Sequence, residues 1–429
     1  MVSINFSSLG KINSQHGCSK EELNFDTDEI SRFLINIANR YQGFYECIDE
    51  VNFSKINNYS EGVSGKYLYI VVLGIGGSAL GTICLDQALK HIYSKEIDQY
   101  PKLYVLDNID PTLINEIQDV IDLEKTLFIV VTKSGSTPET LSQYSYFVNL
   151  ISEQNHTISD HFVFITDPKD NILRKIASQN NIAVFDIPLN VGGRFSVLTS
   201  VGLLPAKLCG LDIDQLLNGA RSMRDKFLSK DVDQNLSYQL AKIQFVLNSK
   251  GKTMNVMLPY YQKLIKFADW YRQLLAESIG KSKNNDGEVV NVGITPVNAL
   301  GVTDQHSQSQ LYNEGPNDKL FIFFEVAQNV DIPIPSVIND DSMNFLRGVT
   351  FGKLLKTEME ATTISLTSND RPNVSIYLDK LGAYELGELF MLFEGAIAFL
   401  GEMYEINAFN QPGVELSKIH TKELLLKNQ

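Results

Sequence analysis

Short apolar runs of strand length alternate with longer segments of helical periodicity along most of this chain. Each run in the first half is continuous in apolar and β-branched residues, as in YLYIVVL and LFIVV, and turn residues follow it. Strands of this kind are buried on both faces, as in a parallel sheet that helices cover on both sides. The alternation therefore predicts an α/β fold. The four runs are Tyr67–Leu73, Lys102–Leu106, Leu127–Val131 and Phe162–Ile165.

A second series of similar runs appears after residue 250, and the residues between the two series, 211–250, are polar and mostly helical. We therefore expect two doubly wound α/β domains with mainly parallel sheets, an N-terminal helical extension and a C-terminal helix. The expected division of the chain is 1–55, 56–210, 211–405 and 406–429. The runs of the second series are Met254–Leu258, Val289–Val292, Leu320–Val326 and Val374–Leu378.

Charge and cysteine content exclude several classes of protein. With 37 Lys and Arg residues against 51 Asp and Glu, the net charge is −14, whereas nucleic acids and anionic membranes favour a basic partner surface. The four cysteines include no CxxC pair, which argues against a disulfide framework or a zinc ribbon. Residues 1–25 lack the apolar core of a signal peptide, and no apolar run approaches the roughly 18 residues of a membrane span. The sequence predicts a soluble cytoplasmic protein that binds neither nucleic acid nor membranes.

The first apolar run leads directly into a glycine-rich loop, Gly74–Gly81, with the sequence GIGGSALG. Glycines such as Gly77 let backbone N–H groups approach a phosphate at the start of a helix, and Ser78 adds a hydroxyl. A dinucleotide-binding fold would use the same device, but the acidic residue expected about 20 positions later is missing. A tight turn without a ligand would also need these glycines, so this loop alone leaves both interpretations open.

A second loop, TKSGSTPET at residues 132–140, follows the third apolar run and holds more hydroxyl groups than a helix start needs. One hydroxyl is enough to cap a helix, and Pro138 suits the first helical turn. The excess favours oxyanion binding at the carboxyl edge of the sheet, where open α/β sheets hold their ligands. We therefore predict a phosphate site here, with Thr132, Lys133, Ser134 and Thr137 as its candidate residues.

The apolar stripe of Lys263–Gly280 predicts a helix that ends at its glycine. This helix places Glu277 in its last turn and Gln273 one turn earlier on the same face. The helix dipole disfavours a carboxylate at this end, which suits a group that has to accept a proton. A glutamate that is simply solvated is the alternative.

Three further segments carry candidate groups. His306 lies in the polar stretch TDQHSQ, and Arg194 follows two glycines in GGRFS. Gln411 and Lys418 are seven residues apart at the start of a C-terminal helix, hence roughly on one face. Each has a simpler explanation: a surface histidine, an arginine that caps a turn, and a surface pair of Lys418 with Glu415. No two of the six histidines have metal-ligand spacing, so no metal site is predicted.

Six segments between residues 71 and 418 together resemble the glucose-6-phosphate isomerase family. Within that family the chain resembles the short bacterial members. The six segments are, in family order, VLGIGGSALG, VTKSGSTPET, NVGGRFSVLTSVGL, ESIGKS, DQHSQSQ and FNQPGVELSK. GGRFS and NQPGVELSK are specific to that family, whereas the GGS and SGSTPET loops are shared among sugar isomerase (SIS) domains. The resemblance implies two SIS-type α/β domains and no cofactor. It also implies reversible conversion of glucose 6-phosphate into fructose 6-phosphate through an enediolate, a step of glycolysis and gluconeogenesis.

The resemblance further implies a role for each candidate residue. Glu277 matches the base that moves a proton between C2 and C1, and Arg194 matches the cation beside the enediolate oxygens. His306 and Lys418 match the groups that assist ring opening, with the division between them left open. The implied active unit is a homodimer in which His306 reaches into the partner subunit's site. The implied substrate contacts are Gly77, Ser78, Thr132, Lys133, Ser134, Thr137, Gln273 and Gln411.

Other functions use similar loops. Another SIS-domain isomerase, such as one that accepts mannose 6-phosphate, would differ in its substrate profile. A sugar-phosphate-binding regulator would keep the phosphate loops but would not need Glu277, His306 and Lys418 together. Such regulators commonly carry a DNA-binding module, and the acidic balance of this chain counts against one. A NAD-dependent dehydrogenase fits less well, because the acid of the dinucleotide fingerprint is missing.

Overall fold

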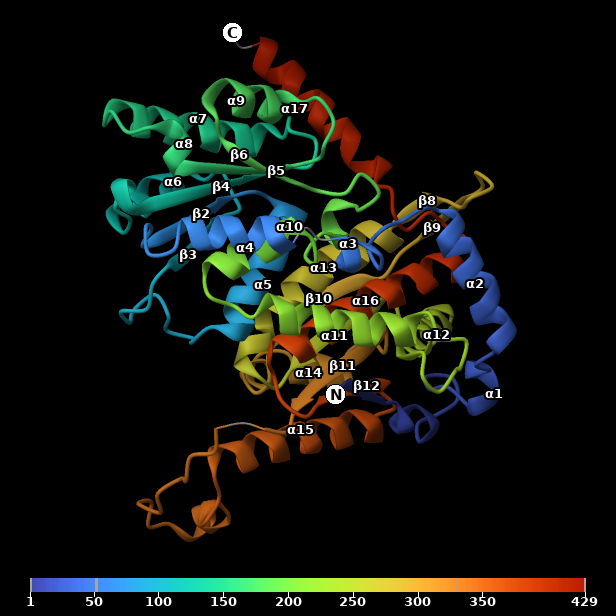
Figure 1. Ribbon diagram of the computed structural model, residues 1–429. Coiled ribbons are helices and arrows are strands. Elements are labelled where there is room, and N and C mark those ends of the chain that lie inside the picture. The colour runs from blue at the N-terminus through green and yellow to red at the C-terminus, as the bar shows by residue number, and fades with distance from the viewer. Residues whose placement is uncertain (1, 51–52, 329, 428–429) are drawn as a thin grey trace.

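Two five-stranded sheets, each mainly parallel, form the framework of the computed structural model (Figure 1). The structure describes residues 2–50, 53–328 and 330–427. Residues 1, 51–52 and 428–429, which belong to the two expected terminal segments, lie outside the described residues. Figure 1 shows the first sheet in the upper half of the molecule and the second in the lower half, with helices between and around them. The expected fold class, α/β with mainly parallel sheets, is confirmed.

The first sheet runs in the order β3 (Lys102–Leu106), β2 (Tyr69–Leu73), β4 (Thr126–Val131), β5 (Phe162–Thr166) and β6 (Ala183–Asp186). All of its neighbouring strands are parallel. Leu73 at the end of β2 pairs with Val130 of β4, so the loops that follow these strands start side by side. The chain passes from β2 to β3 on one side and then crosses to β4 on the other. This is the topological switch point at which open α/β sheets bind their ligands.

Alternate side chains of these strands face opposite sides of the sheet. Val72 belongs to the core that the sheet shares with α5 and α10, whereas Val71 belongs to the core shared with α7 and α9. The first sheet is therefore covered on both faces, as its continuous apolar runs predict. Its helices are α4 (Phe53–Gly62), α5 (Leu80–Leu89) and α10 (Ser200–Leu208) on one face, and α6 (Pro111–Glu116), α7 (Pro138–Glu153), α8 (Ile158–His161) and α9 (Ile172–Asn180) on the other.

The second sheet runs in the order β1 (Val2–Asn5), β12 (Asn373–Leu378), β11 (Lys319–Val326), β7 (Met254–Pro259) and β10 (Thr295–Asn298). Its pairs are parallel except for β1, which lies antiparallel to β12 and is a strand that the sequence did not predict. The expected strand Val289–Val292 does form, as β9, but in a separate ribbon with β8 (Lys281–Lys283). Val289 is 70% exposed, so this run lacks the two buried faces of a central strand.

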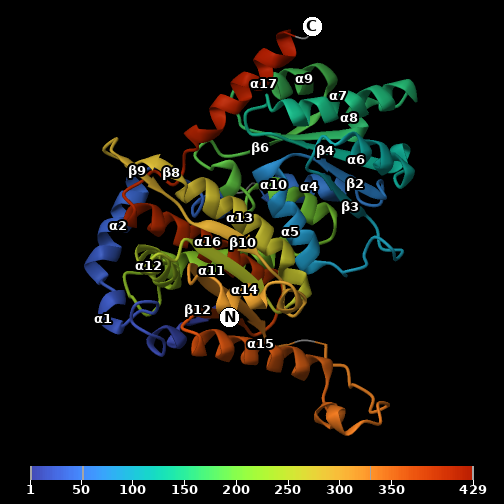
Figure 2. The same cartoon turned by 180° about the vertical axis from the view of Figure 1, so that it is seen from behind.

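Helices between the two sheets join them through one continuous apolar core. Its central element is α16, which the sequence predicted over Tyr384–Tyr404 and which is buried along nearly its whole length, as a helix that is apolar on all sides should be. Figures 1 and 2 show α13 and α16 crossing the middle of the molecule. These central helices are α11 (Ile213–Phe227), α12 (Leu236–Ser249), α13 (Ile265–Ile279) and α16 (Ala383–Met403). The other face of the second sheet carries α14 (Ser309–Glu314) and α15 (Phe351–Ser368).

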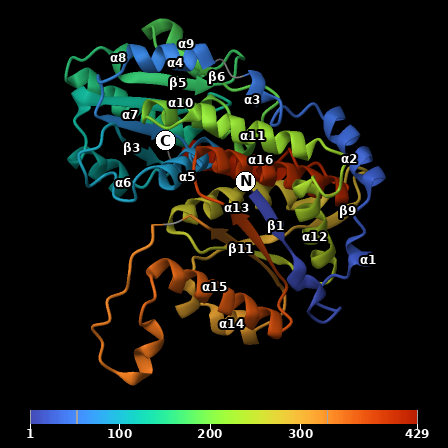
Figure 3. The same cartoon turned by 60° about the horizontal axis from the view of Figure 1, so that its bottom comes forward.

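The ends of the chain and one internal segment lie at the periphery. The N-terminal helices α1 (Lys20–Leu23), α2 (Thr27–Asn39) and α3 (Cys47–Glu50) precede the first sheet. The C-terminal helix α17 (Glu415–Lys427) has no buried residue and extends past the first sheet, and residues 330–350 project beyond α15 (Figure 3). No helix within the described ranges is long and apolar enough to cross a membrane.

Candidate active site

The glycine-rich loop after β2 packs directly on the GGRFS loop. A Cβ atom at Gly77 would lie 2.3 Å from the carbonyl oxygen of Gly193, so only glycine allows this approach. Gly76 has a φ of +58°, and a Cβ there would lie 2.9 Å from Nε2 of Gln273 on α13. The first-sheet loop, the GGRFS loop and the predicted catalytic helix therefore converge on one place. Ser78 ends the short 3-10 helix Gly76–Ser78 within this contact and is half-buried.

The loop TKSGSTPET, residues 132–140 and here called the threonine-rich loop, follows the neighbouring strand β4. Its hydroxyl groups do not cap the helix that it leads into. Thr137 occupies the N-cap position of α7, yet its side chain makes no capping hydrogen bond. Instead its Oγ1 lies 2.6 Å from Oγ1 of Thr132. Ser134 is exposed, and its Oγ accepts hydrogen bonds from the N–H and hydroxyl of Ser136 at 3.3 and 3.1 Å. A helix start with spare N–H groups and clustered hydroxyls can hold an oxyanion.

Lys133 of the same loop is committed to backbone oxygens. Its Nζ donates to the carbonyls of Leu189 and Val191 at 3.0 and 2.7 Å. Burial lowers the pKa of this lysine, while Asp167 acts in the opposite direction. Lys133 thus ties the threonine-rich loop to the segment that leads into GGRFS, and it adds positive charge between them.

Arg194 is the hub of the site. Its side chain is buried, and Nε donates to Oγ of Ser278 on α13 at 2.7 Å. Nη1 donates to Oε1 of Gln411, and Nη2 donates to the carbonyls of Ala408 and Asn410. One guanidinium therefore joins a first-sheet loop, α13 and the segment before α17. Five N–H donors in a fixed plane make arginine suited to such a junction.

Glu277 meets this guanidinium from the last turn of α13, where the sequence placed it. Its Oε2 lies 3.7 Å from Nη1 of Arg194, and Nε2 of Gln273 donates to its Oε1 at 3.3 Å. The Glu277 side chain is 31% exposed, whereas that of Arg194 is 1% exposed. Burial lowers the pKa of Arg194 to about 10, against the opposing effect of Glu277, so the guanidinium stays charged at neutral pH. A reachable carboxylate beside a fixed cation can accept a proton from carbon while the cation stabilises the negative charge that develops.

For Lys281 the sequence predicts only a local positive charge, whereas the structure gives this lysine specific contacts. It lies just beyond the end of α13, and its Nζ donates to the carbonyls of Glu277 and Ser278 at 2.6 and 2.7 Å. The residue is 8% exposed. A signal was present in the sequence, because a lysine next to a helix C-terminus often bonds the last carbonyls.

His306 makes no hydrogen bond or ion pair with Glu277 among the described residues. It ends the exposed 3-10 turn Thr303–His306, which follows β10. The last residue of β10, Asn298, donates to Oδ1 of Asp269 at 2.6 Å. Asp269 precedes Glu277 by eight residues, which is about 12 Å along the axis of α13.

The two C-terminal candidates differ in placement. Gln411 reaches Arg194, as described above. Lys418 lies on α17, its side chain is 60% exposed, and its Nζ pairs with Oε1 of Glu415 at 2.8 Å. Within this chain, the lysine therefore forms the surface pair that the sequence offered as its simpler explanation, and it does not contact the Arg194 hub.

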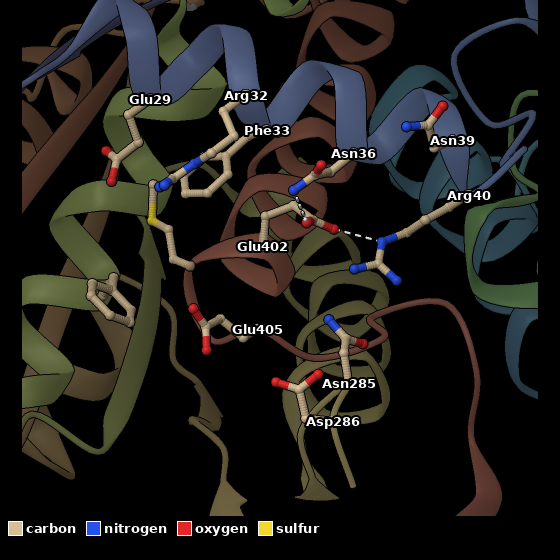
Figure 4. A pocket seen from close by; sticks show the side chains of 12 residues that line it. Glu29, Arg32, Phe33, Asn36, Asn39, Arg40, Asn285, Asp286, Glu402 and Glu405 are labelled. Atoms are coloured by element: carbon tan, nitrogen blue, oxygen red, sulfur yellow. Dashed lines mark hydrogen bonds and ion pairs between the residues drawn. The ribbon is translucent and has the colours of Figure 1, made fainter. Parts of the chain in front are cut away.

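A cavity of about 690 Å³ lies elsewhere, between α2, the end of α16 and the turn of the β8–β9 ribbon (Figure 4). Asn36 of α2 and Arg40, the residue after that helix, donate to the carboxylate of Glu402 at the cavity wall, at 3.2 and 2.6 Å. None of the predicted site residues lines this cavity. Over the part of the chain that the structure describes, no group of three or more His, Cys, Asp or Glu residues is placed to hold a metal ion.

Comparisons with known proteins identify the family and the fold. Residues 35–429 match the phosphoglucose isomerase family. A glucose-6-phosphate isomerase of Carboxydothermus hydrogenoformans is 45% identical over 393 residues, which are 89% of this chain and 84% of that protein. A solved structure of a hypothetical protein from Thermus thermophilus has a TM-score of 0.88 at 32% identity and covers 99% of this chain and 100% of its own. A glucose-6-phosphate isomerase from Chlamydia trachomatis shares the fold, with a TM-score of 0.75 at 24% identity over 86% of this chain and 72% of that one.

Proposed function

Because this chain belongs to the phosphoglucose isomerase family, we propose that it isomerises its sugar phosphate at the point where Glu277 meets Arg194. The chain is an aldose–ketose isomerase that interconverts glucose 6-phosphate and fructose 6-phosphate, a step of glycolysis and gluconeogenesis. The observation that carries the assignment of the site is the 3.7 Å approach of a partly exposed carboxylate to a buried guanidinium that other contacts hold in place.

In the central step Glu277 removes the proton from C2 of the open-chain aldose and returns it to C1. The electron pair left by the proton forms the C1=C2 double bond of the enediolate, and the π electrons of the C1 carbonyl move to its oxygen as negative charge. The proton of the C2 hydroxyl passes to the oxygen at C1, so the charge is shared between the two oxygens and C2 becomes the carbonyl carbon when C1 is protonated. Arg194 stabilises this charge without having to move, because its guanidinium is already fixed. The same carboxylate both takes and gives the proton, so the reaction needs no redox cofactor.

We assign the substrate phosphate to the two loops at the carboxyl edge of the first sheet. The backbone at Gly77 and the hydroxyl of Ser78 lie in one loop, and the hydroxyls of Thr132, Ser134 and Thr137 lie in the other, with the charge of Lys133 nearby. The phosphate is remote from the reacting carbons, so its binding energy serves to hold C1 and C2 against Glu277. Gln273 and Gln411, which contact Glu277 and Arg194, are placed to bind sugar hydroxyls.

Ring opening needs a proton removed from the C1 hydroxyl and another delivered to the ring oxygen, and we assign these transfers to His306 and Lys418. Neither residue makes a hydrogen bond or ion pair with Glu277 of its own chain in the described structure, and Lys418 pairs with Glu415 instead. The proposal therefore includes a homodimer in which His306 completes the partner subunit's site. The proposal also includes the division of the chain into an N-terminal extension, two α/β domains and a C-terminal helix, with boundaries after residues 55, 210 and 405. We place the protein in the cytoplasm, together with its substrates, because charged sugar phosphates do not cross membranes unaided.

The test of the site is Glu277→Gln, which keeps the shape of the side chain but removes its basicity. Turnover of fructose 6-phosphate in a coupled assay should fall ~10²–10⁴-fold, and exchange of the C2 hydrogen with solvent should fall with it. Binding of the sugar phosphate should remain. Glu288→Gln, an exposed glutamate on the ribbon, is the matched control and should keep full turnover. A Glu277→Gln enzyme with more than about a tenth of the wild-type turnover would remove Glu277 from the mechanism.

A further inference from the structure

We propose that Lys281 is a positioning residue that holds the last turn of α13, so that the base Glu277 and the guanidinium of Arg194 keep their mutual geometry. The proposal deepens the proposed function and rests on it, because it gives Lys281 its effect through Glu277. The lysine itself contacts backbone oxygens and is not assigned to the substrate.

The geometry of the helix end shows what the lysine does. α13 ends at Ile279, and Gly280 takes an extended conformation that directs the chain into β8. The last four carbonyls of a helix have no partner within the helix. Lys281 folds back over this end, and its ammonium donates to two of those carbonyls, at 2.6 and 2.7 Å. A cation here also complements the negative end of the helix dipole.

The two carbonyls belong to the residues on which the site depends. One is the carbonyl of Glu277, so the lysine fixes the backbone that carries the base. The other is the carbonyl of Ser278, whose Oγ accepts from Nε of Arg194 at 2.7 Å. A single ammonium therefore restrains both partners of the 3.7 Å ion pair, one through its own backbone and the other through a serine. Displacements of about 1 Å at such a pair can cost about 10²-fold in rate.

The electrostatic surroundings of Lys281 make this restraint dependent on pH. Two charged groups face it, Glu277 from α13 and Arg194 from the GGRFS loop. Burial and, to a smaller degree, the charge of Arg194 together lower the pKa of Lys281 to about 8, while Glu277 acts in the opposite direction. Below about pH 8 the amine is charged and bonds the helix end strongly. Above it the amine becomes neutral, and both its donor strength and its charge at the helix end decrease.

The experiment compares Lys281→Met with a matched control, Lys252→Met. Lys252 is also buried, its pKa is also lowered to about 8, and its Nζ also donates to a backbone carbonyl, that of Asn317. Lys252 precedes β7, and its Nζ also donates to Oδ1 of Asn317, two residues before β11, so it lies at the amino ends of these two strands. Lys281→Met should lower kcat about 10- to 100-fold with little change in KM. Lys252→Met should keep the wild-type kcat, whatever its effect on thermal stability.

The pH dependence of kcat in Lys281→Arg is a measurement that would not change if Lys281 had only a structural role. Arginine stays charged throughout the working range, so this variant should recover most of the lost kcat. The decline of wild-type kcat as the pH rises through about 8 should be absent from it or shifted upward. A Lys281→Met enzyme with wild-type kcat and pH profile would overturn the proposal. If Lys281→Met does not fold, a Lys281→Arg enzyme that shows the unshifted wild-type decline would overturn it as well.

The Glu277→Gln variant separates failure of this inference from failure of the proposed function. If Glu277→Gln is inactive while Lys281→Met is fully active, only the role of Lys281 is rejected. If Glu277→Gln is itself active, the site assignment fails, and the positioning role of Lys281 is rejected with it.

Discussion

The hydroxyl oxygens of Thr132 and Thr137 lie 2.6 Å apart, at the end of β4 and the start of α7. Because Thr137 makes no capping bond with its own helix, the first N–H groups of α7 remain unpaired by its side chain. Two hydroxyls and a helix start therefore face one place at the carboxyl edge of the first sheet. This arrangement supports the assignment of the substrate phosphate to the threonine-rich loop.

Thr137→Val tests that assignment, because valine keeps the shape of threonine but removes the hydroxyl. The KM for glucose 6-phosphate should rise about 10- to 100-fold, the effect of losing one hydrogen bond to a charged group. Thr140→Val is the matched control from the same helix. Its Oγ1 is buried and has no hydrogen-bond partner among the described residues, so removing it should neither raise KM nor lower stability. Unchanged phosphosugar binding by Thr137→Val would show that the loop does not hold the phosphate.

The first sheet could be predicted from the sequence because its strands are buried on both faces. Their continuous apolar runs therefore differ clearly from the turns and helices on either side. Two errors arose in the second sheet, where this contrast fades. β1 is an edge strand of only four residues, so its alternation of apolar and polar residues is too short to stand out. Val289–Val292 has the composition of a buried strand but pairs only with β8, because composition does not specify a partner. Thr295–Asn298, with a proline and two polar residues, takes the place beside β7.

The sequence could predict candidate site residues only where a short local pattern marks them. Glycines and hydroxyls after strand ends marked the two loops, and helical spacing placed Gln273 one turn from Glu277. The contact of Arg194 with the carbonyl of Ala408 spans 214 residues, and no local pattern reports such a closure. For Lys281 the sequence predicts only a local charge, because its contacts depend on folding back over a helix end. The roles assigned to all of the site residues remain predictions, and those of His306 and Lys418 rest on the family resemblance alone.

A buried carboxyl group away from the site makes stability depend on pH. Glu394 of α16 is fully buried, and within the described chain neither of its carboxyl oxygens has a hydrogen-bond partner. Burial raises its pKa well above the ordinary value of 4.5. The folded state therefore keeps a proton that the unfolded state releases above about that pH, so the free energy of unfolding falls as the pH rises.

Glu394→Gln removes this titration. Urea unfolding between about pH 5 and pH 8 should show the variant gaining stability over the wild type as the pH rises, by at most about 1.4 kcal/mol per pH unit. Glu116→Gln, an exposed glutamate of α6, is the control and should run parallel to the wild type. Parallel curves for the wild type and Glu394→Gln would mean that Glu394 carries no proton at these pH values.

The last prediction concerns the homodimer. His306 lies on an exposed turn and makes no described hydrogen bond or ion pair with Glu277, so each proposed site takes its base from one chain and its histidine from the other. Glu277→Ala and His306→Ala should each be nearly inactive. When they are unfolded together and reassembled in equal amounts, about half of the dimers should contain one chain of each kind, since the pairing interface is the same in both variants.

In such a mixed dimer one site carries both defects, whereas the other pairs a native Glu277 with the partner subunit's native His306. Half of the dimers with one of two sites intact gives about a quarter of all sites, so activity should recover to roughly that fraction of wild type. If both groups came from one chain, every site would keep a defect and mixing would restore nothing. Mass labelling of one variant must show that mixed dimers have formed. Mixed dimers without recovered activity would reject the shared site. Each of them would hold one site with a native Glu277 and the partner subunit's native His306, which is all that the shared site requires of these two residues.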